Sequence, residues 1–397
     1  MQGVSVGRHD AVKQGRGGGY PPRAAVVSVV IIAALLLVTS TMAAASNLST
    51  QAAQMAPGTF VELTGMTNWD TGGILTPSGC GRQDAITQYA NTAVWNPIAK
   101  RFQFSGSPHA PCSGTNEKAV FYDDAANSWG TLPNPNGSAN DPRHSYGHNA
   151  MNPATGEHYC HNYNSTQNLR LANGGSGWQS LAPFPNSTQC CNSQAFFPDR
   201  NSLLRWDGSF GLYEYSPSSN SWTARAGAEV SISGLPGFSC GSVCQPSWSL
   251  YSVRCRCIIF GNGPVLEKFN SDGTFTALTH AGGPSSINIS PSGNASVVVD
   301  PVSGFLIVIV QGGTMFVLDP GSTNTATGTW SRGPAVPSFF NAGNGVNESL
   351  ISAPISTYGV VMYVKHDDSG TGRVFLYKHA PSTPQIIPGV PGNVVAR

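Results

Sequence analysis

The sequence predicts an all-β protein, a six-bladed β-propeller of four-stranded blades whose last blade is closed by an N-terminal strand. The main observation is a repeated pattern: an apolar run, a polar turn and then a strand that begins with an aromatic residue. These aromatic residues are Trp129, Trp178, Trp222, Phe275 and Trp330. Self-similarity at intervals of 44 to 55 residues is typical of propellers and solenoids. The 46 Gly, 29 Pro and only 10% charged residues favour many tight turns over long helices.

Each repeat contains four runs with strand composition, rich in Val, Ile, Leu, Phe and Tyr. First strands are expected at residues 93–97, 149–153, 195–199, 248–252, 297–301 and 350–354. Second strands are expected at residues 101–104, 157–161, 202–206, 255–260, 305–310 and 359–364. Third strands are expected at residues 119–123, 168–171, 212–215, 265–270, 314–319 and 374–378. The aromatic residues named above begin the fourth strands.

The sixth repeat lacks a fourth strand, because the chain after residue 378 passes into a Pro-rich tail. Residues 58–63 (GTFVEL) match residues 273–278 (GTFTAL), which hold the fourth strand of the fourth repeat. We therefore expect residues 58–63 to complete the last blade and to close the ring. Closure packs every sheet face against a neighbour and leaves only short edges. The first blade is expected to carry insertions at residues 67–82 and 107–115.

The N-terminal region predicts export from the cytoplasm. Residues 1–23 form a basic lead, and residues 24–45 carry no charge over a length that can span a bilayer. This segment is either a cleaved signal peptide, with Ala43, Ala44 and Ala45 near the cleavage site, or a retained signal anchor. Residues 46–57 are expected to be a linker, residues 58–380 the propeller and residues 381–397 a Pro-rich tail. The protein is therefore expected to be secreted or held at the cell surface.

The cysteines and glycosylation motifs are compatible with an extracytoplasmic location. Nine Cys occur, and in an exported chain most are expected to be paired. The candidate disulfides are Cys80–Cys112 and Cys240–Cys244. Cys255 and Cys257 are expected in one strand, on the same face. Asn-X-Ser/Thr motifs that permit glycosylation include Asn136, Asn164, Asn186, Asn288, Asn294 and Asn347.

Three of the repeats resemble kelch repeats. The resemblance rests on residues 120–129 (VFYDDAANSW), on residues 212–222 (LYEYSPSSNSW) and on the double glycine Gly312-Gly313 before Trp330. The chain thus resembles kelch and galactose-oxidase-type propellers over about residues 58–380, although the second and fourth repeats lack a clear double glycine. This resemblance implies the fold. Copper radical oxidases of this fold use a Cys cross-linked to a Tyr, a second Tyr and two His, and no such set can be placed here.

Candidate ligand-binding residues lie in the loops that join successive blades and in those between second and third strands, which open on one face around the axis. They are Trp69, Asp70, Arg82, Arg143, His144, Trp206, Asp207, Trp248, His366 and Asp367. Tryptophan beside Asp or Arg suits sugar recognition, because the ring covers apolar sugar faces while the charged groups bind hydroxyls. Trp206 and Trp248 are alternatively packing residues of the blades. His158 and His161 should point to opposite faces of a strand, which argues against a shared metal ion.

These observations favour a binding or adhesion module that recognises a glycan or a protein. A structural subunit of an extracellular assembly and a galactose-oxidase-like or glycan-active enzyme are the alternatives. No known catalytic motif is present in the sequence, and no cofactor or metal is expected. Nucleic acid is excluded as a partner by the net charge of +1 and the lack of a basic cluster after residue 45. Membrane contact is expected only through residues 24–45, if they are retained, and self-assembly is possible.

Overall fold

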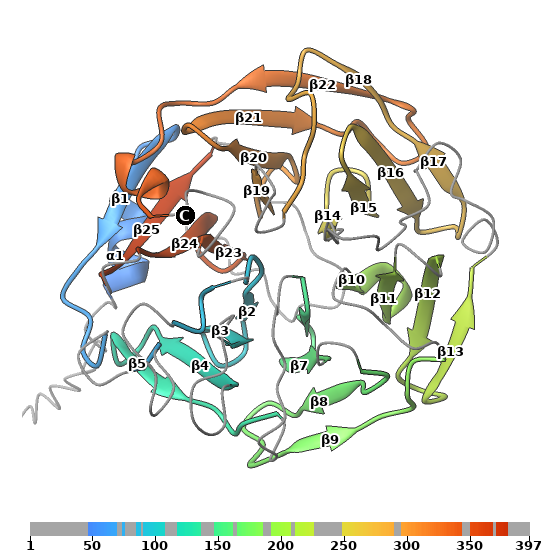
Figure 1. Cartoon of the computed structure of the whole chain (residues 1–397), viewed down its shortest axis with the longest axis horizontal. Helices are drawn as coiled ribbons and strands as arrows, with labels where there is room; N and C mark the ends of the chain where they lie inside the picture. The colour runs from blue at the N-terminus through green and yellow to red at the C-terminus, as the bar shows by residue number, and fades with distance from the viewer. Residues whose placement is uncertain are drawn as a thin grey trace, which may run out of the picture. The chain divides into compact units, whose positions relative to one another are not determined.

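The structure, a computed structural model, describes residues 47–69, 74–75, 85–88, 90–107, 117–135, 147–161, 165–185, 192–207, 211–225, 248–289, 295–343, 350–367 and 371–379. All of them belong to one compact unit, Ala43–Arg397. Six antiparallel sheets follow one another around a ring in this unit, as Figure 1 shows. The predicted six-bladed propeller is therefore confirmed.

Each blade runs from an innermost first strand to a peripheral fourth strand. Blade 1 contains β2 (Val94–Asn96), β3 (Arg101–Gly106), β4 (Lys118–Asp123) and β5 (Ser128–Thr131). Blade 2 contains β6 (Asn149–Asn152), β7 (Glu157–Cys160), β8 (Leu169–Leu171) and β9 (Trp178–Ser180). Blade 3 contains β10 (Asn192–Phe197), β11 (Ser202–Asp207), β12 (Gly211–Ser216) and β13 (Ser221–Ala224). Blade 4 contains β14 (Trp248–Ser252), β15 (Cys257–Asn262), β16 (Val265–Asn270) and β17 (Phe275–Ala277). Blade 5 contains β19 (Ala295–Val299), β20 (Leu306–Val310), β21 (Thr314–Asp319) and β22 (Thr327–Arg332). Blade 6 contains β23 (Leu350–Ile355), β24 (Val360–His366), β25 (Gly372–Lys378) and β1 (Thr59–Leu63).

Strand β1 closes the ring as predicted. It pairs antiparallel with β25, from Thr59 opposite Lys378 to Leu63 opposite Val374. Phe60 stacks on Tyr377 with 4.5 Å between ring centroids, and Arg373 donates to Glu62 over 2.8 Å. The N-terminal strand therefore satisfies the outer edge of blade 6 and covers its aromatic side chains.

Two of the repeated aromatic residues link their blade to the preceding one. The indole N–H of Trp178 in blade 2 donates to the carbonyl of Pro133, where the chain leaves blade 1. Trp222 in blade 3 donates in the same way to Ala182, at the exit of blade 2. Since each indole also packs against its own blade, on His158 and on Tyr215 respectively, these two tryptophans dock successive sheets.

Blade 5 departs from the four-strand expectation. A fifth strand, β18 (Thr279–Ala281), pairs parallel with β22 at its outer edge. The segment that connects blade 4 to blade 5 runs along this edge, and the Thr279 N–H donates to the Ala326 carbonyl over 2.7 Å. The connection therefore protects the edge of the sheet instead of crossing directly to the next inner strand.

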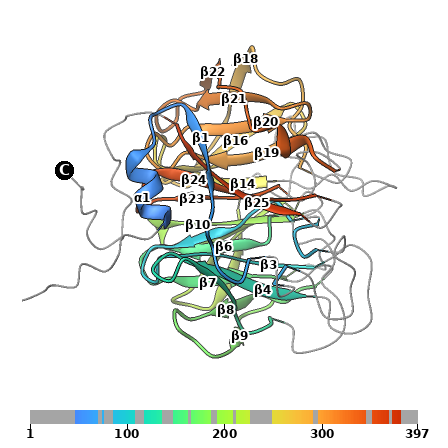
Figure 2. The same ribbon diagram turned by 90° about the vertical axis from the view of Figure 1, so that its left-hand side faces the viewer.

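The segment expected to be a linker contains helix α1 (Asn47–Gln54). Leu48 and Ala52, four residues apart and hence on one face of the helix, are buried in the core shared by blades 1 and 6. The Lys378 ammonium group donates to the Ala52 carbonyl over 3.0 Å. Figure 2 shows α1 beside β1. In the described part of the chain, no helix is both long and apolar enough to cross a membrane.

The expected strand at residues 255–260 begins two residues later than predicted. Cys255 lies in the turn between β14 and β15, and Arg256 has a positive φ of 49°. Cys255 forms a disulfide with Cys257, the first residue of β15. The two cysteines therefore fasten the tight turn of blade 4 instead of standing together on one strand.

Candidate functional site: the axial pocket

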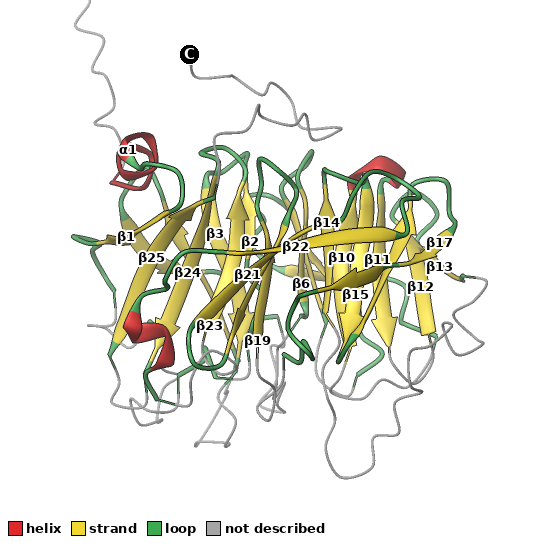
Figure 3. Cartoon of the chain, turned by 90° about the horizontal axis from the view of Figure 1, so that it is seen from above, coloured by secondary structure: helices red, strands yellow, loops and turns green. Residues whose placement is uncertain are grey.

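A cavity of about 160 Å³ lies where the first strands of the six blades converge. It extends from the middle of these strands to the turns between first and second strands. These turns and those between third and fourth strands share one face of the ring, called here the turn face. Figure 3 shows α1 at the same end of the strands as the short helix η1 (Pro198–Arg200), which forms one of these turns.

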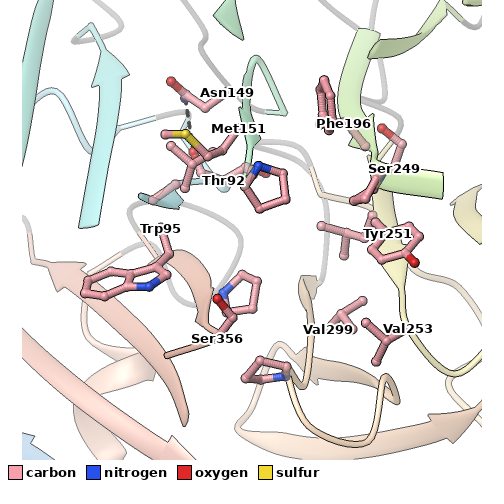
Figure 4. Close-up of a pocket in the computed structure, with 18 of the residues that line it drawn as sticks. Thr92, Trp95, Asn149, Met151, Phe196, Ser249, Tyr251, Val253, Val299 and Ser356 are labelled. Carbon is pink, nitrogen blue, oxygen red and sulfur yellow. Dashed lines mark hydrogen bonds between the residues drawn. The ribbon is translucent and has the colours of Figure 1, made fainter. Parts of the chain in front are cut away.

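Six side chains, one from each blade, form the wall of the cavity. They are Trp95, Met151, Phe196, Tyr251, Val299 and Pro354. Each pairs with the second strand of its own blade at the same sequence separation, as in Trp95 opposite Phe102 and Val299 opposite Leu306. They therefore occupy equivalent positions on six strands and form a ring around the axis. Figure 4 shows Trp95, Met151, Phe196, Tyr251 and Val299 around the cavity.

The rim of the cavity consists of residues from the first turns. Pro153, Pro198, Val253, Pro301 and Ser356 line it, each two positions after a wall residue. Proline suits this place because it fixes the backbone of a turn and needs no N–H partner at the free inner edge of the blade. The mouth is consequently rigid and largely apolar.

The floor is polar. Thr92, Asn149, Gln194 and Ser249 line it. Asn149 joins blade 2 to blade 1: its side-chain amide donates to the Thr92 carbonyl over 3.1 Å, and its Oδ1 accepts from the Ser105 N–H over 3.0 Å. Gln194 joins blade 3 to blade 2 through its Nε2, which donates to the His148 and Tyr159 carbonyls. The floor therefore links neighbouring inner strands.

The polar groups of the wall are held away from the cavity. The Trp95 indole N–H donates to Thr357 Oγ1 over 2.9 Å. The Tyr251 hydroxyl donates to Asp199 over 2.6 Å, and burial together with this carboxylate raises the pKa of Tyr251. The two rings thus present apolar and π surface to the cavity.

Three buried oxygen atoms of the lining residues have no hydrogen-bond partner among the described groups. They are Gln194 Oε1, Ser249 Oγ and Asp300 Oδ1. The other oxygen of Asp300 accepts from the backbone N–H and the hydroxyl of Ser303, both over 2.7 Å. Asp300 is fully buried and is the one charged side chain among the described lining residues. All three oxygens are buried behind the surface of the cavity, so its accessible lining is mainly apolar.

Part of the predicted loop site lies within the described residues. Trp69 packs on Trp129 at 4.9 Å and donates its indole N–H to the Gly372 carbonyl. Gly372 pairs with His366, a buried residue at the end of β24, so the structure brings Trp69 next to the hairpin that carries His366 and Asp367. The side chain of Asp367 accepts from the Thr371 N–H over 2.8 Å. This hairpin is on the face opposite the axial pocket.

The other predicted site residues are not gathered around one described cavity. Trp206 and Trp248 are both 2% exposed, and Trp206 packs on Phe260 at 4.9 Å. Asp207 ends β11, where it pairs with Gly211. Asp70, Arg82, Arg143 and His144 lie outside the described residues.

The histidines of blade 2 point to opposite sides, as predicted. His158 bonds to Gln103 and Asn149 on the side of blade 1, whereas His161 contacts Arg205 of blade 3 over 3.2 Å. His148 packs on His161 with 3.8 Å between ring centroids. Within the described ranges, no three His, Cys, Asp or Glu side chains form a group that could hold a metal ion.

Most of the covalent-modification candidates lie outside the described residues. These are Cys80, Cys112, Cys240 and Cys244, and Asn136, Asn164, Asn186, Asn294 and Asn347. Asn288 is described and half-buried: its Oδ1 accepts from the Gly263 N–H over 2.9 Å and its amide donates to Ser286. Cys160 is buried in β7 and forms no disulfide.

No protein-family model matches the chain, and no curated protein sequence matches it.

Proposed function

We propose that this propeller is an extracytoplasmic binding module that recognises a protein partner through the axial pocket on its turn face. The partner inserts one side chain into the pocket while its surrounding surface rests on the rim. The kelch-type repeats supply the scaffold, and the six inner strands supply the contacts. The observation that carries the proposal is the ring of six wall residues, one from each blade, around a preformed cavity.

The surface around the mouth favours a protein over a free small molecule. Ile98 is 46% exposed, and among the described residues it is the one large apolar side chain with such exposure. It stands on the first turn of blade 1, beside Pro97. It gives apolar surface on the turn face outside the cavity, which a small ligand would leave uncovered but a protein would bury.

The chemistry of the wall favours a protein over a glycan at this site. Sugars need hydrogen-bonding groups around their whole rim, whereas Trp95 and Tyr251 direct their polar atoms to Thr357 and Asp199, away from the cavity. A cavity of about 150 Å³ is enough to hold a benzene-sized group. One side chain of moderate size therefore suits the volume.

An extracytoplasmic location is supported by the uncharged segment at residues 24–45 and by the disulfide between Cys255 and Cys257. We expect a protease added to intact cells to digest the propeller of the anchored form, or the protein to accumulate in the medium if the segment is cleaved. Full protection inside intact cells, without secretion, would contradict this location.

The binding proposal is tested by selecting a displayed peptide library on the immobilised full-length protein. Enriched peptides are expected to bind the wild-type protein and to lose at least tenfold in affinity for Ser356→Trp, which fills the mouth from its half-buried rim. Ser218→Trp, the same change on an exposed outer turn of blade 3, is the matched control and should bind normally. Enriched peptides that bind Ser356→Trp as tightly as wild type would place recognition elsewhere.

A further inference from the structure

We propose that the propeller has a second binding site, a polar pocket between blades 1 and 2 that accepts one uncharged sugar ring of a glycan. This inference goes beyond the proposed function, because the described residues that line this pocket are all different from those that line the axial pocket. It is carried by three features: a polar interface between the two blades, hydrogen-bonding groups left over in the lining, and the absence of an unpaired charge among the described lining residues.

The interface between blades 1 and 2 differs from the others. Five clusters of buried apolar side chains among the described residues each join two neighbouring blades, and none of these five joins blades 1 and 2. Polar contacts connect these two blades instead. Gln103 bonds to His158 over 3.1 Å, and Asn149 Oδ1 accepts from the Ser105 N–H over 3.0 Å. This interface therefore offers polar groups where the other five are filled with apolar side chains.

A cavity of about 200 Å³ lies in this interface. Asn96 and Ala99 line it from the first turn of blade 1, and Asn173 lines it from the turn between β8 and β9 of blade 2. Gln103 and Phe121 line its deeper part, on β3 and β4. Since a cavity of about 150 Å³ holds a benzene-sized group, this one has room for a six-membered ring with substituents.

The amide side chains of the lining are held in place from both blades. The Asn96 amide donates to the Gly156 carbonyl over 3.2 Å and to Asn173 Oδ1 over 3.1 Å. The amide nitrogen of Asn173, an exposed residue, is left as a donor. Gln103 uses its Nε2 for His158, which leaves its side-chain oxygen as an acceptor. The pocket therefore holds a donor and an acceptor in fixed positions.

Arg101 adds further donors without adding net charge. Its Nε donates to Asp123 over 2.8 Å, and its guanidinium group lies 4.2 Å from the centroid of the Phe121 ring. The ring leans over Gly130, where a Cβ atom would come within 2.6 Å of it. The ion pair and the ring fix the guanidinium plane, and its terminal N–H groups remain for a ligand.

This set of groups suits a sugar. A hydroxyl group both donates and accepts, so it can bond to guanidinium and amide groups alike. Leu132, Pro133 and Leu171 also line the pocket and give apolar contacts for the C–H groups of a sugar ring. Arg101 is the one charged side chain among the described lining residues, and Asp123 neutralises it. The pocket is therefore expected to prefer an uncharged polyol to an anion.

The probes are the methyl glycosides of glucose, galactose, mannose and N-acetylglucosamine, titrated into the full-length protein and followed by ligand-observed NMR. Cyclohexanol, a ring with one hydroxyl group, and the methyl glycoside of glucuronate, which carries a carboxylate, are the comparison ligands. We expect at least one neutral glycoside to bind about tenfold or more tightly than cyclohexanol. The proposal is overturned if none does so, or if the glucuronide binds more tightly than every neutral glycoside.

Variants locate the bound sugar. Ala99→Trp, which fills the pocket from a half-buried turn position, should weaken the bound glycoside at least tenfold. Ala125→Trp is the matched control, because it makes the same change on an exposed turn of the same blade outside the pocket lining. Arg101→Lys keeps a positive charge for Asp123 but loses the planar fork of donors, so it should weaken binding several fold. Wild-type affinity in Ala99→Trp, with a normal melting temperature, would refute this site.

The axial pocket provides a separate control. Ser356→Trp, which fills the axial mouth, should leave the affinity for the glycoside unchanged. If Ser356→Trp abolishes glycoside binding while Ala99→Trp does not, the sugar occupies the axial pocket and this inference is wrong. The selection of peptides tests protein recognition independently, so either proposal can fail while the other stands.

Discussion

His158 shows how a single buried side chain is fixed in one protonation state. It is fully buried between blades 1 and 2. Asn149 Oδ1 accepts from its Nε2–H over 3.0 Å, and its Nδ1 accepts from the Gln103 amide over 3.1 Å. A second proton on the ring would point at the amide donor of Gln103. Burial lowers the pKa of His158 to about 3.

Stability should therefore fall on acidification. The unfolded chain takes up a proton at His158 below about pH 6.5, whereas the folded chain does so only near pH 3. The unfolded state is therefore stabilised relative to the folded state as pH falls through this window. At pH 5 this amounts to about 2 kcal/mol. His158→Gln, which can keep both hydrogen bonds, should flatten this part of the pH dependence in urea unfolding. His280→Gln, at the periphery of blade 5, is the control; an unchanged slope in His158→Gln would contradict the account.

The burial of Glu267 gives a pH effect of opposite sign. Glu267 in β16 is 2% exposed, its Oε2 has no partner among the described groups, and burial raises its pKa to about 7. Between pH 4.5 and 7 the folded state holds a proton that the unfolded state has lost, so stability falls as pH rises. Glu267→Gln should raise the melting temperature at pH 8 but not at pH 5. A gain of equal size at both values would show that ionisation is not the cause.

At the scale of an element, β1 is a strand from the N-terminal part of the chain that completes the blade formed by the C-terminal part. Its ring contacts bring Phe60 to 4.5 Å from Tyr377 and 5.8 Å from Phe340, and its backbone pairs with β25 from Val374 to Lys378. Without β1, an apolar sheet edge would face solvent.

Deleting residues 59–63 should therefore prevent cooperative folding or lower the melting temperature by more than 10 °C, which corresponds to several kcal/mol in a domain of this size. The milder Phe60→Ala should lower the free energy of unfolding by about 2 kcal/mol, since the ring is half-buried. Removing residues 385–397 is the control and is expected to leave stability unchanged. A melting temperature that survives the β1 deletion would rule out closure by this strand.

The sequence identifies some elements more easily than others. Strand β1 was predictable because residues 58–63 repeat the motif around Phe275. Helix α1 was not, since eight residues with one Leu have no clear helical period, and their helical form depends on the core between blades 1 and 6 that receives Leu48 and Ala52. Strand β18 likewise depends on pairing with the edge of β22, and no local sequence pattern predicts that this edge is free.

At the scale of the whole molecule, the axial pocket exists only because six blades meet. Trp95, Met151 and Val299 read as ordinary strand residues in the sequence, and nothing local marks them as neighbours. The sequence does contain one indication. Each of these residues precedes its partner on the second strand by the same number of residues, so an alignment of the repeats would place them at equivalent positions in one ring. The chemistry of that ring could not be inferred without the directions of the Trp95 and Tyr251 polar atoms.

The closure by β1 also decides how the ring responds to mechanical force. Thr59 is paired with Lys378, so both ends of the propeller leave from the same end of one antiparallel strand pair. A force applied at the two termini would break these hydrogen bonds one after another, in the unzipping geometry, and not all at once in the shear geometry. Helix α1 lies at this vulnerable end, where the Lys378 ammonium group holds the Ala52 carbonyl and Leu48 is buried in the core. In a protein tethered through its N-terminal segment, α1 thus takes tension before the first pair of β1 and β25 can separate.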